Sequence, residues 1–226
     1  MPRIIYATDL HDNLKHWEFL EEASNYFDAT FYGGDHIGPI HGNDTIAEQK
    51  QIVDRTWWLA GWAGNYFGVT GNHDITEIEK LRNWHSDLSI FPHLRVNGRE
   101  HEFMGLAVDL VDYMNEGYAT GRTSVCIEHV PPEHSDCAIS RYGIDQGDLM
   151  LHQRLQAGAG PRLLLCGHQH EPRKTWCRVG VTTVINPGTS HANAHHPHWV
   201  DLHLDAGKPW KAFIHAGGRV EEIAIN

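Results

Sequence analysis

Tyr66-Phe67-Gly68-Val69-Thr70-Gly71-Asn72-His73-Asp74 joins an apolar run to a carboxamide, an imidazole and a carboxylate. The apolar run is typical of a short buried strand, because it is brief and flanked by turn residues. Polar groups that directly follow a strand are typical of α/β enzymes, which bind ligands beyond the carboxyl ends of their strands. We therefore expect this segment to lie at the functional edge of a sheet.

The first third of the chain predicts alternating strands and helices around this segment. Apolar residues at three-residue intervals indicate a helix over residues 13–24, Thr45-x-x-Glu48 resembles a capping box, and Asp74-x-x-Glu77 resembles another helix start. The second half is strand-rich, with one predicted helix over residues 145–156. The predicted strands cover residues 4–7, 29–32, 66–69, 102–110, 124–128, 162–166, 179–185, 199–204, 211–215 and 220–225. This pattern predicts an α/β protein in which a second sheet packs on the first.

The composition limits the class of protein. The 226 residues are 41% hydrophobic, which suffices for one substantial core, and no stretch resembles a linker, so we expect a single domain over residues 1–226. The net charge of -11 argues against a nucleic-acid surface, because such surfaces neutralise phosphates with many cations. No apolar run is long enough for a membrane span or a signal peptide, which predicts a cytoplasmic protein without membrane association. The four cysteines lack C-x-x-C spacing and predict buried free thiols.

Five short clusters of metal-ligand residues occur along the chain, most of them directly after a predicted strand. The clusters are Asp9-Leu10-His11, Gly33-Gly34-Asp35, Asn72-His73-Asp74, His129 and Gly167-His168-Gln169-His170. Each cluster is common when taken singly, but strand ends meet at one edge of a sheet, so five such clusters together predict a two-metal site. Carboxylate, carboxamide and imidazole ligands suit divalent Mn, Fe, Ni, Co or Zn better than Ca, which prefers oxygen alone.

The ordered pattern D-x-H, G-D, G-N-H-D, H and G-H-x-H resembles the calcineurin-like metallophosphoesterase superfamily. The compact length is similar to that of its small bacterial and archaeal phosphodiesterases. The motifs extend from Asp9 to His170, and the turn Asn186-Pro187-Gly188-Thr189 extends the likeness to most of the chain. The resemblance implies a four-layer αββα sandwich of two mixed β-sheets flanked by helices, with a dimetal site at the strand ends.

The resemblance also implies a division of the ligands between two ions, with Mn²⁺ as the first choice of metal. The first ion would be held by Asp9, His11, Asp35 and His170. The second would be held by Asp35, Asn72, His129 and His168, so that Asp35 bridges the pair. His73 is left without a metal and would donate a proton to the leaving oxygen.

The implied activity is hydrolysis of a small phosphate ester, either a monoester or a diester, by attack of a metal-bridging hydroxide. Nucleotides are among the candidate substrates. A nuclease of the same superfamily is disfavoured by the acidic charge. A non-catalytic interaction scaffold is the alternative of a different class, since a fold does not guarantee activity. The complete ligand motifs argue against the scaffold, which could lose them without harm.

Several positions leave alternatives open. Related protein phosphatases carry an orienting aspartate where this chain has Gly38, so His73 needs another partner, and Asp74 is either that partner or a helix N-cap. His36 and Asn186 are candidate substrate contacts, although His36 is equally well explained as an ordinary loop histidine.

The remaining candidates lie outside these motifs. The histidine tract at 191–198 either binds phosphate or a third ion, or forms a solvated loop. Trp58 and Trp62, one helical turn apart, either line another surface or form a contact in a homo-oligomer.

Overall fold

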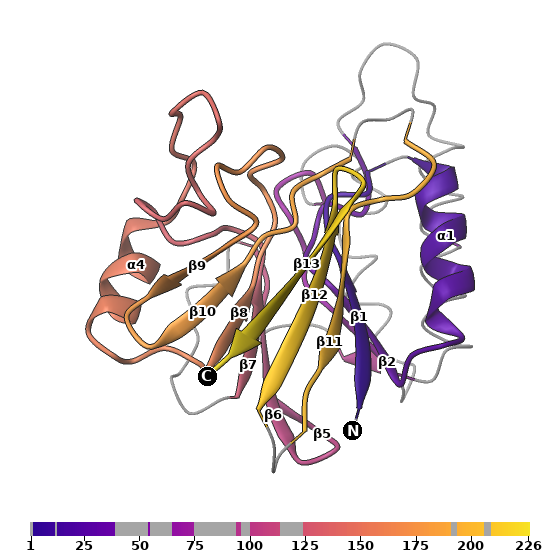
Figure 1. Ribbon diagram of the computed structural model, residues 1–226, viewed down its shortest axis with the longest axis horizontal. Helices are drawn as coiled ribbons and strands as arrows, with labels where there is room; N and C mark the ends of the chain where they lie inside the picture. Colours follow the sequence, from indigo (N-terminus) through magenta and orange to yellow (C-terminus); the bar gives the residue numbers. More distant parts are fainter. Residues whose placement is uncertain are drawn as a thin grey trace.

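The computed structural model describes residues 2–11, 13–38, 54, 65–74, 94–95, 100–113, 124–190, 194–205 and 209–226 (Figure 1). Two helices and thirteen strands have been assigned within these ranges. In chain order the elements are β1 (Arg3–Ala7), α1 (Leu14–Ser24), β2 (Ala29–Tyr32), β3 (Tyr66–Gly68), β4 (Leu94–Arg95), β5 (Glu100–Phe103), β6 (Leu106–Val111), β7 (Val125–Glu128), α4 (Leu149–Gln156), β8 (Leu163–Leu165), β9 (Trp176–Val179), β10 (Thr182–Ile185), β11 (Trp199–His203), β12 (Trp210–Ala216) and β13 (Arg219–Ile225).

The strands form two mixed sheets. The first has the order β13-β12-β11-β1-β2-β3-β4 and the second the order β5-β6-β7-β8-β10-β9. In the first sheet β1, β2, β3 and β4 are parallel, and the other three strands are antiparallel to their neighbours. In the second sheet β6, β7, β8 and β10 are parallel, between antiparallel edge strands. Parallel strands place their carboxyl ends at one edge, so each sheet has one edge where its central loops gather.

Alternation of side chains along β1 divides the core. Ile4 and Tyr6 face the second sheet and join one buried cluster with Val125 of β7 and Leu163 of β8. Ile5 faces the opposite side and belongs to the cluster beneath α1. The two sheets therefore pack face to face around a shared apolar core.

Within the part of the chain that the structure describes, one helix covers the outer face of each sheet, as Figure 1 shows. Trp17 and Leu20 of α1 are fully buried against the first sheet, and Leu151 and Leu155 of α4 pack on the second. The order of layers is helix, sheet, sheet, helix, which confirms the predicted αββα sandwich of two mixed sheets. Among the described helices, none is both long and apolar enough to cross a bilayer.

Both helices begin at a side-chain cap, one of them later than predicted. The side chain of Asn13 accepts from the backbone N–H of His16 and starts α1 at the predicted place. Helix α4 starts at Leu149, after the N-cap Asp148, rather than at residue 145. The reason is local: the Asp145 carboxylate accepts from the N–H of Gly147 and forms a turn instead.

Two predicted strands are hairpins in the structure. Residues 102–110 turn at Met104-Gly105, where φ is +51° and +80°, as a type I′ turn requires. Residues 179–185 turn at Gly180-Val181, with φ of +59° at the glycine. The helices predicted after Thr45 and Asp74 lie outside the described residues, except that Asp54, within the first of them, is helical.

Candidate metal centre

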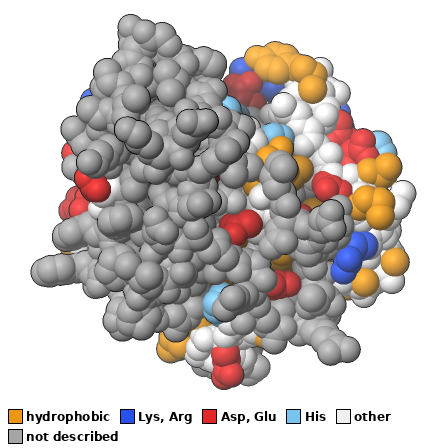
Figure 2. All heavy atoms as spheres, turned by 180° about the vertical axis from the view of Figure 1, so that it is seen from behind, with side chains coloured by type: hydrophobic (Ala, Val, Ile, Leu, Met, Phe, Trp, Pro, Cys, Tyr) orange, Lys and Arg blue, Asp and Glu red, His pale blue; other side chains and the backbone are white. Residues whose placement is uncertain are grey.

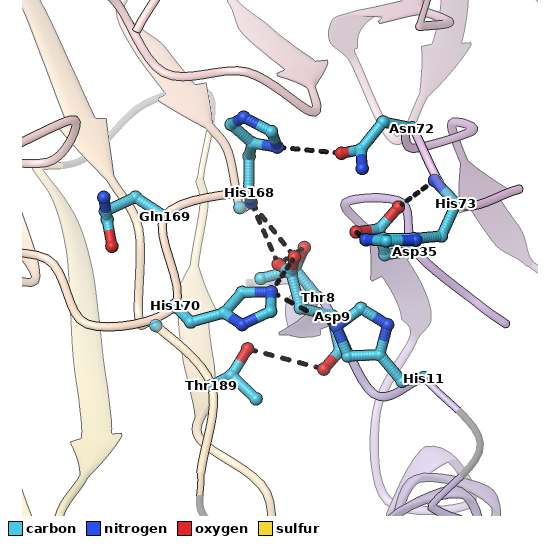
Figure 3. A network of polar contacts seen from close by, with 12 residues as sticks. Thr8, Asp9, His11, Asp35, Asn72, His73, His168, Gln169, His170 and Thr189 are labelled. Atoms are coloured by element: carbon cyan, nitrogen blue, oxygen red, sulfur yellow. Dashed lines mark hydrogen bonds and ion pairs between the residues drawn. The ribbon is translucent and has the colours of Figure 1, made fainter. Parts of the chain in front are cut away.

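The loops after the parallel strands of both sheets meet at one place. Asp9 and His11 follow β1, Asp35 follows β2, and Asn72 and His73 follow β3. The loop after β8 approaches from the second sheet with His168 and His170 (Figure 3). His129 follows β7. All seven predicted ligand residues thus gather where the two sheets face each other.

The first group of ligand atoms belongs to Asp9, His11, Asp35 and His170, whose atoms lie within 4.8 Å of one another. The Nε2 atoms of His11 and His170 are 3.2 Å apart. His170 Nε2 is also 3.4 Å from Asp9 Oδ1. Both carboxylates are buried, whereas the two imidazoles reach the surface. This arrangement points two carboxylates and two ring nitrogens at one small volume.

The second group is centred on the Asn72 side-chain oxygen. His129 Nε2 lies 3.1 Å from Asn72 Oδ1, and His168 Nδ1 lies 2.8 Å from the same atom. His129 Nε2 is 3.4 Å from Asp35 Oδ2, so Asp35 stands between the two groups. The other ring nitrogen of His129, Nδ1, bonds to the Gly33 carbonyl at 2.7 Å, which fixes the orientation of the ring.

The donor set fits a pair of divalent transition metals. Two buried carboxylates, one amide oxygen and four imidazoles supply mixed nitrogen and oxygen ligands, and such sets suit Mn, Fe, Co, Ni or Zn. Among the described side chains that line the adjoining pocket there is neither Lys nor Arg. Positive charge for an anionic ligand would therefore come from bound cations.

The backbone of the site is strained. Asp9, His11, Asp35 and His168 have φ of +53°, +49°, +56° and +63°, and they are four of the six non-glycine residues with positive φ in the described part of the chain. Such a conformation costs about 1–3 kcal/mol for each residue and is typical of functional sites. The fold holds these four side chains in place against their local preference.

Buried hydrogen bonds hold the two carboxylates. The Asp9 carboxylate accepts from the Thr8 hydroxyl at 2.6 Å and from the backbone N–H of His168 at 3.1 Å. Asp35 Oδ1 accepts from the N–H of His73 at 2.9 Å. A side chain at Gly71 would collide with the Asp35 carboxylate, so this close approach requires glycine. The ligand loops therefore position one another.

The ionisable groups shift one another's pKa values. Burial alone would raise the pKa of Asp9, but the hydrogen bond from His170 and nearby imidazoles hold it well below its usual range. Burial opposes a charge on His129, yet Asp35 outweighs it and raises the pKa of His129 to about 9. Burial, reinforced by His129, lowers the pKa of His168 to about 4. His168 is therefore uncharged at neutral pH, whereas His129 holds a proton that a metal ion would have to displace on binding.

His73 lies beside the ligands. Its Nε2 is 3.9 Å from Asp35 Oδ2, its side chain is 26% exposed, and burial lowers its pKa. Asp74 does not orient it. The Asp74 carboxylate accepts from the N–H groups of His36, Ile37 and Gly71, and pairs with His36 Nδ1 at 2.9 Å. Asp74 thus ties the loop after β2 to the loop after β3.

Two predicted substrate contacts are wrong. His36 is fully buried, and its ring nitrogens contact Asp74 and the Tyr66 hydroxyl, so it cannot line a substrate mouth. Asn186 is also fully buried: its amide nitrogen donates to the carbonyls of Cys137, Gly167 and Gln169. The burial of Asn186 could have been expected from the sequence, since Asn186 directly continues a buried strand.

A pocket of about 470 Å³ opens beside the site and brings in residues that sequence reasoning missed. One side carries the ligand and His73 side chains. The other is the loop between β7 and α4, with Ser140, Tyr142, Ile144 and Gln146. This loop has neither helical nor strand periodicity, and only its apolar Tyr142 and Ile144 among turn residues mark it in the sequence. From the histidine tract, His198 links the Pro187 carbonyl to the Gly217 N–H.

Comparison with known proteins gives the fold. An archaeal phosphodiesterase is 18% identical with a TM-score of 0.51, over 98% of this chain and 99% of that chain. YfcE, a phosphoesterase from E. coli, is 16% identical with a TM-score of 0.51, over 99% of this chain and 100% of that chain. The chain therefore shares its fold with these two phosphoesterases. No family model matches the sequence, and no curated protein matches it.

The phosphoesterase fold also occurs in a protein of another description. GAP50, the anchor in the inner membrane complex of Plasmodium, is 12% identical with a TM-score of 0.57, over 100% of this chain and 88% of that chain. At identities this low the likeness establishes the fold alone, and activity has to be argued from the site.

Proposed function

We propose that this protein is a dimetal-dependent phosphoesterase that hydrolyses a small phosphate ester. One observation carries the proposal: seven ligand side chains from both sheets converge, with Asp35 between the two groups. A non-catalytic scaffold has no need of four strained ligand positions, each of which costs stability. The strain is therefore better explained by a function in metal binding.

Each of the two groups of ligand side chains described above would hold one metal ion. Asp9, His11, Asp35 and His170 would bind one ion, and Asp35, Asn72, His129 and His168 the other. Two divalent cations, with Mn²⁺ as the first choice, would lower the pKa of a bound water and neutralise charge on phosphoryl oxygens. Thr8, Gly33 and the N–H of His168 hold the ligands in these positions.

His73 would act on the leaving group. It lines the pocket beside Asn72 and His168 and belongs to neither group of ligand side chains. An imidazole at this place can donate an N–H to the oxygen that departs from phosphorus. Its nearest described carboxylate is Asp35, whose Oδ2 lies 3.9 Å from His73 Nε2. The protein phosphatases have an orienting aspartate at the position of Gly38, and Asp35 would take over that role here.

The proposed substrate is a small ester rather than a nucleic acid. The pocket of about 470 Å³ is in the range of small-molecule sites. The net charge of -11 disfavours a long polyanion, whose binding requires many cationic side chains.

The test combines metal analysis with hydrolysis of bis(p-nitrophenyl) phosphate, with and without a chelator. We expect about two metal ions per chain and hydrolysis that the chelator abolishes and Mn²⁺ restores. Asp35→Asn should lose metal, whereas His73→Ala should keep both metals and lose about 10²- to 10⁴-fold in rate. His195→Ala, which changes an exposed histidine outside the pocket, is the matched control. A protein that binds no Mn²⁺ and hydrolyses nothing would leave the scaffold as the better explanation.

A further inference from the structure

The pocket beside the metal centre has two chemically different sides. The side formed by Asp35, Asn72, His73, His168 and His170 is polar and suits a phosphate group. The opposite side presents Tyr142 and Ile144. A pocket of about 470 Å³ has room for more than the phosphate, so the organic part of the ester has to lie against this second side.

Hydrogen bonds hold the loop that carries Tyr142 and Ile144. Ser140 Oγ accepts from the N–H groups of Tyr142 and Ile144 at 3.2 and 3.0 Å, and Ser140 N–H donates to the Ile144 carbonyl at 2.7 Å. Gln169 Nε2 donates to Gln146 Oε1 at 2.8 Å. Because Gln169 stands between His168 and His170, the loop is fastened directly to the metal-ligand segment. Its position relative to the metal centre is therefore fixed.

The two apolar side chains of this loop are exposed to an unusual degree. Tyr142 is 71% exposed and Ile144 is 61% exposed. Figure 2 shows hydrophobic side chains at the upper right of the molecule, on the side where this loop lies after the turn from Figure 1. Large apolar groups at the mouth of a polar site are typical of ligand contacts.

The Tyr142 ring is held from one side. The Arg141 guanidinium lies over the ring, 4.8 Å from its centre, and pairs with the Glu171 carboxylate at 2.8 Å. Glu171 follows the ligand His170 and lines the same pocket. A ring supported on one face by a guanidinium offers its other face to a flat partner.

We propose that the ester hydrolysed here carries a flat aromatic ring that stacks on Tyr142 and contacts Ile144, while its phosphate lies at the polar side of the pocket. This inference rests on the proposed phosphoesterase activity. Tyr142 is then a specificity residue, which contacts the organic group and takes no part in the chemistry. Simple aryl groups and nucleobases share the required chemistry, so the experiment distinguishes them.

The test uses three diesters that share trifluoroethanol as one ester and carry methyl, phenyl or 5′-thymidine as the other, so that the methyl compound has no aromatic ring; loss of the diester is followed by ³¹P NMR. In the Mn²⁺-loaded protein, Tyr142→Ala should lower kcat/KM for the aromatic esters about tenfold, the loss expected for one stacked ring, and leave the methyl ester unchanged. Tyr142→Phe should retain wild-type values because it keeps the ring. Tyr26→Ala is the matched control, since Tyr26 is 73% exposed and lines a different hollow.

The outcomes separate the two proposals. A loss with both phenyl and thymidine esters supports a general aromatic site, and a loss with the thymidine ester alone supports a nucleoside site. Equal effects of Tyr142→Ala on all three esters, or no effect on any, overturn the inference while the phosphoesterase proposal stands. Failure of the wild-type protein to hydrolyse any of the three overturns both. Unfolding temperatures of the variants confirm that each one is folded.

Discussion

Replacing Asn186 with alanine should weaken the fold and the metal centre together. The Asn186 amide nitrogen donates to the carbonyls of Cys137, Gly167 and Gln169 at 3.1, 2.9 and 3.0 Å, and its oxygen accepts from Gly188 N–H at 2.9 Å. An amide has two N–H groups, so the three acceptors share them and about three full hydrogen bonds are lost. At about 1 kcal/mol each, the free energy of unfolding should fall by about 3 kcal/mol.

The same change should reduce metal affinity. Gly167 and Gln169 flank His168, and their carbonyls are held in place by the Asn186 side chain. Without this support, His168 and His170 are no longer fixed for binding. Loss of an outer hydrogen bond of this kind lowers metal affinity about 10- to 100-fold.

Urea unfolding and metal titration of the Asn186→Ala variant measure both effects. For a chain of this size, about 3 kcal/mol corresponds to a fall in Tm of about 6–12 °C. Asn25→Ala is the control: its side chain donates to two carbonyls at the exposed end of α1, and its loss should cost about 0.5 kcal/mol. If Asn186→Ala were as stable as Asn25→Ala and bound metal normally, the structural role of Asn186 would be refuted.

Three further predictions concern other parts of the molecule. Gly71→Ala should lose metal and about 2 kcal/mol or more of stability, because the new methyl group meets the Asp35 carboxylate, and metal analysis with urea unfolding measures this. Alkylation of Cys177 by iodoacetamide should rise with pH through about 7, because the hydrogen bond between the Cys177 and Cys137 thiols, 3.5 Å apart, lowers the pKa of Cys177 to about 7. Burial raises the pKa of the Cys126 thiol, so Cys126 should stay unmodified in the folded protein. Peptide mass spectrometry measures the labelling of both cysteines across that pH range, and equal labelling of the two would contradict the lowered pKa of Cys177. A chelator should lower the Tm of the Mn²⁺-loaded protein by about 5–10 °C, as calorimetry would show, and an unchanged Tm would argue against a bound metal.

The sequence predicted the fold and the gathering of the ligands because both depend on strands. Asp9, Asp35 and His168 follow strands whose apolar runs are visible in the sequence, and parallel strands bring such residues to one edge. The sequence did not predict the hairpin at Met104-Gly105, since methionine is not a usual turn residue.

The buried polar contacts could not be read from the sequence in the same way. Nothing local shows that the His36 ring is enclosed by Asp74 and Tyr66, which lie more than twenty-five residues away. Tyr142 belongs to a loop without periodicity, and its place beside the metal centre depends on contacts with Gln169 and Glu171, far along the chain.

The left-handed backbone at His11 and His168 sets stability against activity in any search for improved variants. Glycine adopts this conformation without penalty, so His11→Gly relieves strain in the folded chain at the same time as it removes a side chain that we propose as a metal ligand. A library selected only for resistance to heat or protease would therefore enrich variants that lack the proposed ligands at these positions. Selection in the presence of Mn²⁺ should instead favour the variants that keep both histidines, because bound metal then stabilises them.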